Sequence, residues 1–263
     1  MLSRLSRPKA LAVCALPVVA LLATAAFAPL PFSLAQPGPT ANVLGENKGT
    51  PVITVSGAAT RRTSGQLRMV TIVATGPDAR VSVGDVIGDW FRTDRAVMPR
   101  DSVYPSGNSV KEAEEHNRAQ MRQSQNAATQ AALKYLGLSA DQVRVKLKLA
   151  DVGGPSAGLL FTLGIIDKLD GDGGGGDLTG GRTIAGTGTI DADGKVGAVG
   201  GVALKTQAAH RDGATVFLVP KAECADAEAG LPKGLRLVPV TTLKGAVDSL
   251  VALEKGKGTV PAC

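Results

Sequence analysis

The chain has 263 residues, of which 44% are hydrophobic, and this length is enough for one domain with a substantial core. The formal net charge is +6 at pH 7, but Arg4, Arg7 and Lys9 contribute three positive charges before the first acidic residue. The remaining excess is small and only 3% of the residues are aromatic, so the composition argues against a nucleic-acid-binding protein.

The N-terminal segment has the pattern of a targeting or anchoring sequence. It begins with basic residues only, and the stretch from Ala10 to Ala35 carries no charge. About 20 apolar residues suffice to cross a bilayer, so residues 1–35 are predicted to be a transmembrane anchor with the rest of the chain outside the cytoplasm. A cleaved signal peptide and secretion are the alternative, because Ala26-Phe27-Ala28 and Ser33-Leu34-Ala35 both have the small-x-small form.

A linker and two strands are expected next. Residues 36–50 contain several prolines and glycines, which is typical of a linker. Two runs rich in β-branched residues follow at 52–55 and 67–73, with a turn-like segment at 63–66 between them. These runs are predicted to be strands that can pair as a hairpin.

A long helix and a further strand come before the most informative motifs. Ser109-Val110-Lys111-Glu112 has the form of a capping box, and apolar residues then return at helical spacing until Gly137. The polar residues of this helix, among them His116 and Ser124, are interpreted as its solvated face. Residues 143–149 alternate between apolar and mostly basic side chains, which predicts a half-buried strand.

The remainder of the chain alternates between helical and extended patterns. Helices are expected at 156–168, 202–211 and 243–253, and strands at 184–190, 215–219 and 235–240. Such alternation is typical of an α/β or α+β domain. We place this domain at residues 51–255 and interpret residues 256–263 as a C-terminal tail.

Neither a nucleotide nor a metal site is expected. The glycine-rich run 171–176 lacks the lysine and hydroxyl residue of a phosphate-binding loop, and GxxxxGK[ST] occurs nowhere, so we expect a flexible surface loop, no ATPase module and no cofactor. The two histidines, His116 and His210, are far apart and no CxxC pair is present. Cys224 and Cys263 are the only cysteines beyond the N-terminal segment, and a disulfide between them is predicted.

Ser156 is a candidate nucleophile. It lies in Gly153-Gly154-Pro155-Ser156-Ala157-Gly158, where the strand at 143–149 leads into an apolar helix. Glycines let a substrate backbone approach closely, Pro155 fixes the turn, and the first amides of a helix can stabilise a carbonyl oxygen that becomes negative. Gly154, Pro155 and Ala157 are therefore candidates for the oxyanion and substrate-backbone site. A serine at this place is also a common helix N-cap, so the assignment needs a base.

Two kinds of base are available to this serine. Lys205 lies on a predicted helix among small and apolar residues that can bury an amine, although an arbitrary lysine would reach solvent. His210 or His116, with Asp151 as a third member, would make a serine-histidine-aspartate arrangement, but neither histidine lies in a supporting motif.

These segments resemble the proteolytic domain of Lon-type proteases. Gly154-Pro155-Ser156-Ala157-Gly158 is similar to the nucleophile motif of that family, and Gly200-Gly201-Val202-Ala203-Leu204-Lys205 to the segment with its lysine. Thr187-Gly188-Thr189-Ile190 is similar to the strand whose threonine steadies the two residues. The resemblance implies a Lon-like fold and a serine endopeptidase with a Ser156–Lys205 dyad held in register by Thr187.

More narrowly, the chain is similar to exported, membrane-anchored bacterial Lon-like peptidases without an ATPase. This implies ATP-independent cleavage of unfolded or extended proteins outside the cytoplasm, and a ring-shaped homo-oligomer. Such relatives usually carry a PDZ module where this chain has only residues 138–152, and Gly153 replaces the acidic residue of ATP-dependent Lon, which leaves the role of Asp151 open. A catalytically silent Lon-like domain that binds peptides in the cell envelope is the alternative.

Overall fold

The computed structural model describes residues 7–104, 109–149 and 154–263. Its helices are α1 (Arg7–Phe27), α2 (Val83–Trp90), α3 (Arg100–Val103), α4 (Val110–Leu136), α5 (Gly158–Leu169), α6 (Val202–Arg211), the 3₁₀ turn η2 (Lys221–Glu223), α7 (Cys224–Glu228) and α8 (Leu243–Lys255). Its strands are β1 (Phe32–Asn42), β2 (Glu46–Asn47), β3 (Thr50–Pro51), β4 (Ile53–Ser56), β5 (Gln66–Ala74), β6 (Ala96–Pro99), β7 (Arg144–Leu147), β8 (Thr183–Gly186), β9 (Thr189–Ile190), β10 (Val196–Gly197), β11 (Val216–Pro220) and β12 (Arg236–Val240).

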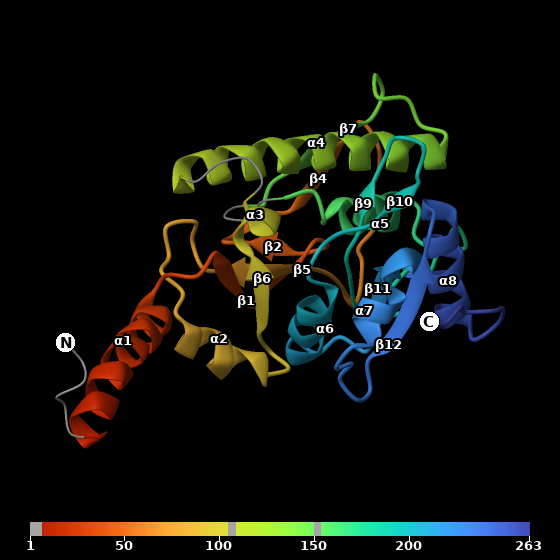
Figure 1. The fold of residues 1–263 in the computed structure, drawn as a ribbon. Helices are drawn as coiled ribbons and strands as arrows, with labels where there is room; N and C mark the ends of the chain where they lie inside the picture. The colour runs from red at the N-terminus through yellow and green to blue at the C-terminus, as the bar shows by residue number, and fades with distance from the viewer. Residues whose placement is uncertain (1–6, 105–108, 150–153) are drawn as a thin grey trace.

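A six-stranded mixed sheet organises the fold. Its strand order is β12-β11-β8-β5-β1-β6. The strands β12, β11, β8 and β5 are parallel, whereas β1 is antiparallel to both of its neighbours. Figure 1 shows α4 along the top of the molecule and α6 below the level of α5. The expected mixture of helices and strands in an α/β domain is therefore confirmed.

Helices cover both faces of the sheet, and β11 shows how. Leu218 packs in the larger hydrophobic cluster, which contains Phe161 of α5, while the adjacent Phe217 packs in a second cluster with Val202 and Ala209 of α6. Successive side chains of a strand point to opposite faces. α5 and α6 therefore lie on opposite faces of the same sheet.

The long helix predicted after the capping box is present as α4. The side chain of Ser109 accepts a hydrogen bond from the Glu112 amide and donates one to the Glu112 carboxylate. Gly137 ends the helix with φ of 67°, the left-handed conformation that favours glycine. One part of the prediction is wrong, because Ser124 is buried rather than solvated.

The interpretation of residues 36–50 as a linker is wrong for residues 36–42, which belong to β1. This strand pairs with β5 through Gln36 opposite Val73 and Thr40 opposite Val70, and the register shifts between Pro37 and Thr40. A bulge of this kind accommodates proline, which has no amide hydrogen to contribute to the ladder. Three of the residues that suggested a linker, Pro37, Gly38 and Pro39, lie at this irregularity.

The predicted N-terminal segment, residues 1–35, is too long, because its last residues belong to the folded domain. Phe32 to Ala35 pair with β6, and Ala35 is only 1% exposed, so they belong to the sheet. Removal of a leader after Ala35 would cut through β1, whereas removal after Ala28 would leave the strand complete. Within the described residues, no helix reaches the length and apolarity needed to cross a membrane.

The two runs expected to form a hairpin are strands, but they do not pair. β4 pairs with β7, with Ile53 opposite Leu147, whereas β5 lies between β1 and β8. Leu67 and Met69 of β5 are 0% and 1% exposed, so this strand lies inside the sheet and requires a partner on each edge. The hairpin prediction is therefore wrong.

The glycine-rich loop at 171–176 is held by hydrogen bonds rather than free. The Asp172 carboxylate accepts bonds from the amides of Gly174 (2.8 Å) and Gly176 (2.7 Å) and lies 3.0 Å from the Lys255 amine. These interactions lower the pKa of Asp172 to about 2, with the Lys255 bond as the largest cause. The expectation of a flexible loop is thus corrected.

A disulfide joins Cys224, at the start of α7, to Cys263 in the C-terminal tail, the pairing that the sequence predicted. The bond closes a segment with a sequence separation of 39 residues. It ties the tail to the part of the domain that follows β11.

Replacement of Cys263 by serine is expected to lower the free energy of unfolding by about 3–4 kcal/mol, because the unfolded chain regains the entropy of an open loop. Denaturant titrations of the oxidised wild type and the variant measure this difference. A reductant should bring the wild type to the midpoint of the variant and leave the variant unchanged. Equal midpoints for the oxidised proteins would show that the bond contributes no stability.

Candidate active site

Ser156 lies in the turn that leads into α5. Gly154 has φ of 88°, a left-handed conformation that suits glycine. Ser124 of α4 donates a hydrogen bond to the carbonyl oxygen of Pro155 at 3.0 Å, which holds the turn against α4. The N-cap residue of α5 is Ala157 and no side chain caps it. The half-buried Ser156 hydroxyl therefore does not serve as a helix cap.

Lys205 lies in the first turn of α6 and is only 3% exposed. Gly201 starts this helix with φ of 68°, and its carbonyl oxygen accepts a hydrogen bond from the Lys205 amide at 3.1 Å. The Lys205 amine donates a hydrogen bond to Thr187 Oγ1 at 3.1 Å. Lys205 is thus not a lysine that extends along the surface to solvent.

Thr187 connects the other two residues. The strand predicted at 184–190 is broken into β8 and β9, and the fully buried Thr187 lies at the break. Its hydroxyl accepts the bond from Lys205 and donates one to the carbonyl oxygen of Ser156 at 3.4 Å. The Gly188 amide donates to the same oxygen at 3.0 Å. Among the described residues, no hydrogen bond joins the Ser156 hydroxyl directly to the Lys205 amine.

The environment of Lys205 makes its amine a usable base. Burial lowers the pKa of Lys205 from 10.5 to about 8, because the charged form loses its hydration, and the Glu223 carboxylate acts in the opposite direction. With a pKa of about 8, roughly a tenth of the amine is neutral at pH 7, compared with about one part in several thousand for an ordinary lysine.

The competing bases occupy less suitable places. His210 is exposed in the last turn of α6, at the other end of the helix from Lys205. His116 is partly exposed near the N-terminal end of α4. Asp151 and Gly153 lie outside the described residues. The structure brings Lys205, and neither histidine, into hydrogen-bonding contact with Thr187.

The backbone near Ser156 narrows the candidates for an oxyanion site. The Gly154 amide already donates to the carbonyl oxygen of Asn117 at 3.1 Å, and Pro155 has no amide hydrogen, so neither donor is available. The amides of Ser156 and Ala157 make no hydrogen bond to any described residue. Of the three residues predicted for the oxyanion and substrate-backbone site, only Ala157 therefore has an amide free of partners among the described residues, together with Ser156 itself, while contact of Gly154 and Pro155 with a substrate backbone stays a prediction.

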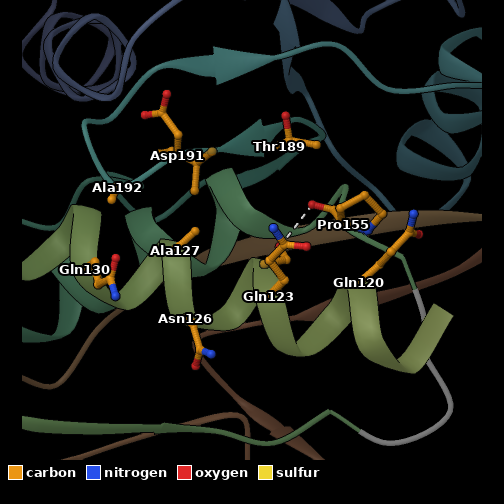
Figure 2. A pocket seen from close by; sticks show the side chains of 11 residues that line it. Gln120, Gln123, Asn126, Ala127, Gln130, Pro155, Thr189, Asp191 and Ala192 are labelled. Atoms are coloured by element: carbon orange, nitrogen blue, oxygen red, sulfur yellow. Dashed lines mark hydrogen bonds between the residues drawn. The ribbon is translucent and has the colours of Figure 1, made fainter. Parts of the chain in front are cut away.

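A pocket of about 560 Å³ opens beside this turn, between α4 and β9. Figure 2 shows the α4 residues Gln123 and Gln130 on one side, Thr189 and Asp191 on the other, and Pro155 at one end. Side-chain amides from Gln120, Gln123, Asn126 and Gln130 give the α4 wall both hydrogen-bond donors and acceptors. The pocket is therefore suited to polar groups next to Ser156.

Sequence reasoning missed two residues of this region. Ser124 was assigned to the solvated face of its helix, but it is 5% exposed and bonds to the turn before Ser156. Glu223, whose carboxylate raises the pKa of Lys205 against the effect of burial, was not recognised from the sequence. The helical spacing of Ser124 from the buried Met121 and Ala128 was the signal that could have placed it on the inner face.

Comparison with known proteins gives a consistent result. Residues 109–252 match the model of the Lon protease (S16) C-terminal proteolytic domain. The chain is 34% identical over 105 residues to "Lon protease 1" of Myxococcus xanthus and 37% identical over 112 residues to "Lon protease" of Chloroflexus aggregans. These alignments cover 39% and 41% of this chain and 12% of the length of either relative.

The matched family segment begins at the N-cap of α4 and ends within α8, so it contains the Ser156 turn, Thr187 and the helix with Lys205. It also covers more than half of the 263 residues. The chain therefore belongs to the family of Lon protease (S16) C-terminal proteolytic domains.

Proposed function

We propose that this chain is a serine endopeptidase in which Ser156 is the nucleophile and Lys205 is the general base. The observation that carries the proposal is the buried Lys205 amine, which shares the Thr187 hydroxyl with the backbone of Ser156. Membership of a family of proteolytic domains supports peptide hydrolysis as the reaction.

The proposed reaction proceeds through an acyl-enzyme. The neutral Lys205 amine takes the proton of the Ser156 hydroxyl while the oxygen attacks the peptide carbonyl carbon. The resulting ammonium then protonates the departing amine, the C–N bond breaks, and an ester to Ser156 remains. Water repeats the sequence on this ester, with Lys205 again accepting a proton, and releases the free acid. The amides of Ser156 and Ala157 would stabilise the oxyanion.

Thr187 has a positioning role in this proposal. Its hydroxyl contacts the Lys205 amine and the Ser156 carbonyl oxygen, but it does not contact the reacting oxygen of Ser156. Catalytic hydrogen bonds commonly shorten only when substrate is bound.

The proposed substrates are unfolded or extended polypeptides, and the polar pocket would receive their side chains. An extended segment that places its carbonyl at Ser156 passes Pro155, which lines both the turn and the pocket. The amides of Gln123 and Asn126 then meet a substrate side chain close to the bond that is cut.

We also propose that the enzyme works outside the cytoplasm and without ATP. The Cys224–Cys263 disulfide supports an oxidising compartment, and the basic, then apolar N-terminal sequence supports export with or without a retained anchor. The printed sequence has no phosphate-binding motif, so turnover is proposed to be independent of nucleotide. A ring-shaped homo-oligomer remains a proposal from family resemblance.

The dyad is tested with Ser156→Ala and Lys205→Arg, which should both reduce kcat/KM for an unfolded protein by at least about a thousandfold. A guanidinium keeps its proton, so arginine preserves the charge but not the base. Lys244→Arg, on the exposed face of α8, is the matched control and should be fully active. Wild-type kcat/KM should rise with pH through about 8, where Lys205 loses its proton.

Near-normal activity of either dyad variant would refute this mechanism. Tight peptide binding by a wild type that cleaves nothing would instead favour a catalytically silent peptide-binding domain.

Lys205→Met is expected to be inactive yet more stable than the wild type. Lowering the Lys205 pKa from 10.5 to about 8 costs the folded protein on the order of 3 kcal/mol at pH 7, and the lost bond to Thr187 offsets about 1 kcal/mol of the gain. Between pH 8 and 10.5 the unfolded wild type binds more protons than the folded one, so wild-type stability should rise with pH there. Denaturant titrations should show a smaller difference in unfolding free energy between Lys205→Met and the wild type at pH 10 than at pH 7. An equally large difference at both pH values would contradict the cost of burying the charged amine.

Gln123→Leu is expected to shift cleavage preference from polar toward apolar side chains. Loss of one substrate hydrogen bond should lower kcat/KM for the preferred polar peptides by roughly tenfold. Sequencing the products of a peptide library measures the change, and Gln142→Leu, an exposed glutamine outside the pocket, is the control. Identical preferences for both variants would show that the pocket does not select substrates.

A further inference from the structure

Glu223 is a buried carboxylate that the reaction does not use directly. It ends η2, the turn that follows β11, and is 8% exposed. Both of its carboxylate oxygens lie 3.0 Å from the backbone nitrogen of Val199, which donates to them. A carboxylate is costly to bury unless it is paired and hydrogen-bonded, so its presence at this place calls for an explanation.

The hydrogen bond from Val199 links Glu223 to the start of α6. Val199 lies two residues before Gly201, whose left-handed conformation begins the helix that carries Lys205. On the other side, η2 continues from β11, and the Leu218 carbonyl oxygen of that strand accepts a hydrogen bond from the Thr187 amide at 3.0 Å. Glu223 thus connects the segment that supports Thr187 with the segment that positions Lys205.

The negative charge of Glu223 raises the pKa of the Lys205 amine, whereas burial lowers it. Burial raises the pKa of Glu223, the Val199 bond and the Lys205 charge lower it, and Asp226 raises it. Of the other charges on elements packed against α6, Arg68 of β5 pairs with Asp212 at 3.9 Å, beyond the far end of the helix.

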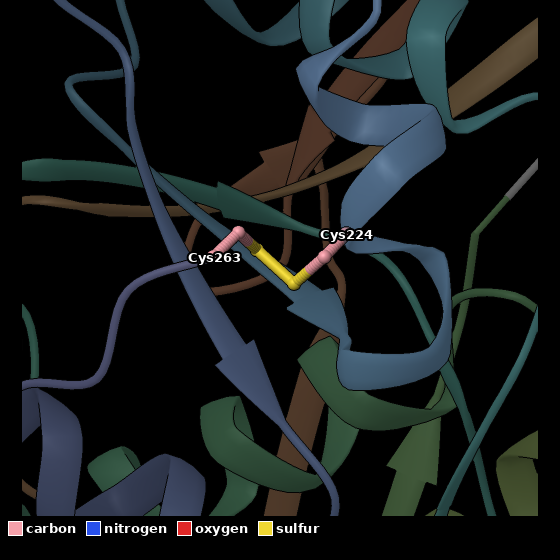
Figure 3. The surroundings of a disulfide bond; sticks show 2 residues. All are labelled: Cys224 and Cys263. Atoms are coloured by element: carbon pink, nitrogen blue, oxygen red, sulfur yellow. A yellow bond between two sulfur atoms is a disulfide. The ribbon is translucent and has the colours of Figure 1, made fainter.

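The disulfide anchors this carboxylate. Cys224 directly follows Glu223 and is bonded to Cys263, and Figure 3 shows the bond between the start of α7 and the C-terminal segment. The residue next to Glu223 is therefore held by a covalent bond, while its side chain is held by Val199. The backbone beside Glu223 and its carboxylate are thus fixed by two separate interactions.

We propose that Glu223 is a positioning residue of the dyad: it holds the start of α6 through Val199 and adds one negative charge to the electrostatic surroundings of Lys205. The proposal rests on the proposed peptidase function. Its two parts are separable, because the hydrogen bond needs only an acceptor oxygen whereas the electrostatic effect needs the ionised carboxylate.

Glu223→Gln separates these parts by keeping an acceptor for Val199 and removing the charge. Without the carboxylate the Lys205 ammonium is less favoured, so the rise of kcat/KM with pH should move to lower pH while the plateau at high pH is retained. At pH 6.5 the variant should show at least about twice the wild-type fraction of its own plateau. Glu228→Gln, which removes an exposed acid from α7, is the matched control and should keep the wild-type profile.

Glu223→Ala also removes the acceptor, so its plateau should fall by at least about tenfold relative to Glu223→Gln. A wild-type pH profile for Glu223→Gln, or equal plateaus for the Gln and Ala variants, would overturn the proposal. Activity that survives Ser156→Ala would overturn the peptidase mechanism instead, so the two failures are distinguishable.

A measurement without any change at Glu223 guards against variants that fail to fold. In Ser156→Ala protein labelled with [13Cε]lysine, the Lys205 resonance, assigned by its loss in Lys205→Met, should respond twice during a pH titration. One response reports its own deprotonation, and a second, separate response reports the ionisation of Glu223. A single inflection would show that the carboxylate does not act on the amine.

Discussion

The burial of one primary amine is the constraint on which the site depends. Lys205 is only 3% exposed, and its pKa falls to about 8 because the folded chain withholds water from the charged form. Such burial opposes folding, so the surrounding packing has to supply the difference. The fully buried Ala208 and Ala209 let α6 pack closely, and Thr187 gives the amine an acceptor without adding a charge.

The sheet brings the three central residues together from distant parts of the chain. Thr187 directly follows β8, Ser156 directly precedes the N-cap of α5, and Lys205 lies in the first turn of α6. Because α5 and α6 cover opposite faces, the start of each helix reaches the carboxyl end of β8 from its own side. In the proposed mechanism, the positive ends of both helix dipoles would favour a neutral lysine and a negative oxygen at Ser156.

The C-terminal part of the domain supports Thr187 and supplies the carboxylate of Glu223. β11 supports the backbone of Thr187 through Leu218, and the chain continues from that strand into Glu223. In the proposed mechanism, burial leaves part of the Lys205 amine neutral near pH 7 by lowering its pKa, and the Glu223 carboxylate prevents that pKa from falling further. The disulfide at Cys224 fixes the chain at the residue that directly follows Glu223.

The sequence by itself determined the long helix that starts at the Ser109 capping box, the alternation of an α/β domain and the motif around Ser156, because these depend on local spacing. Tertiary structure alone decided that residues 36–42 form a strand, since the need of β5 for a second partner outweighs local proline and glycine signals. It also decided the hydrogen-bond partners of Ser124 and Glu223, which are 31 and 24 residues away along the chain. Contacts over such separations follow from how the elements pack, which no local pattern records.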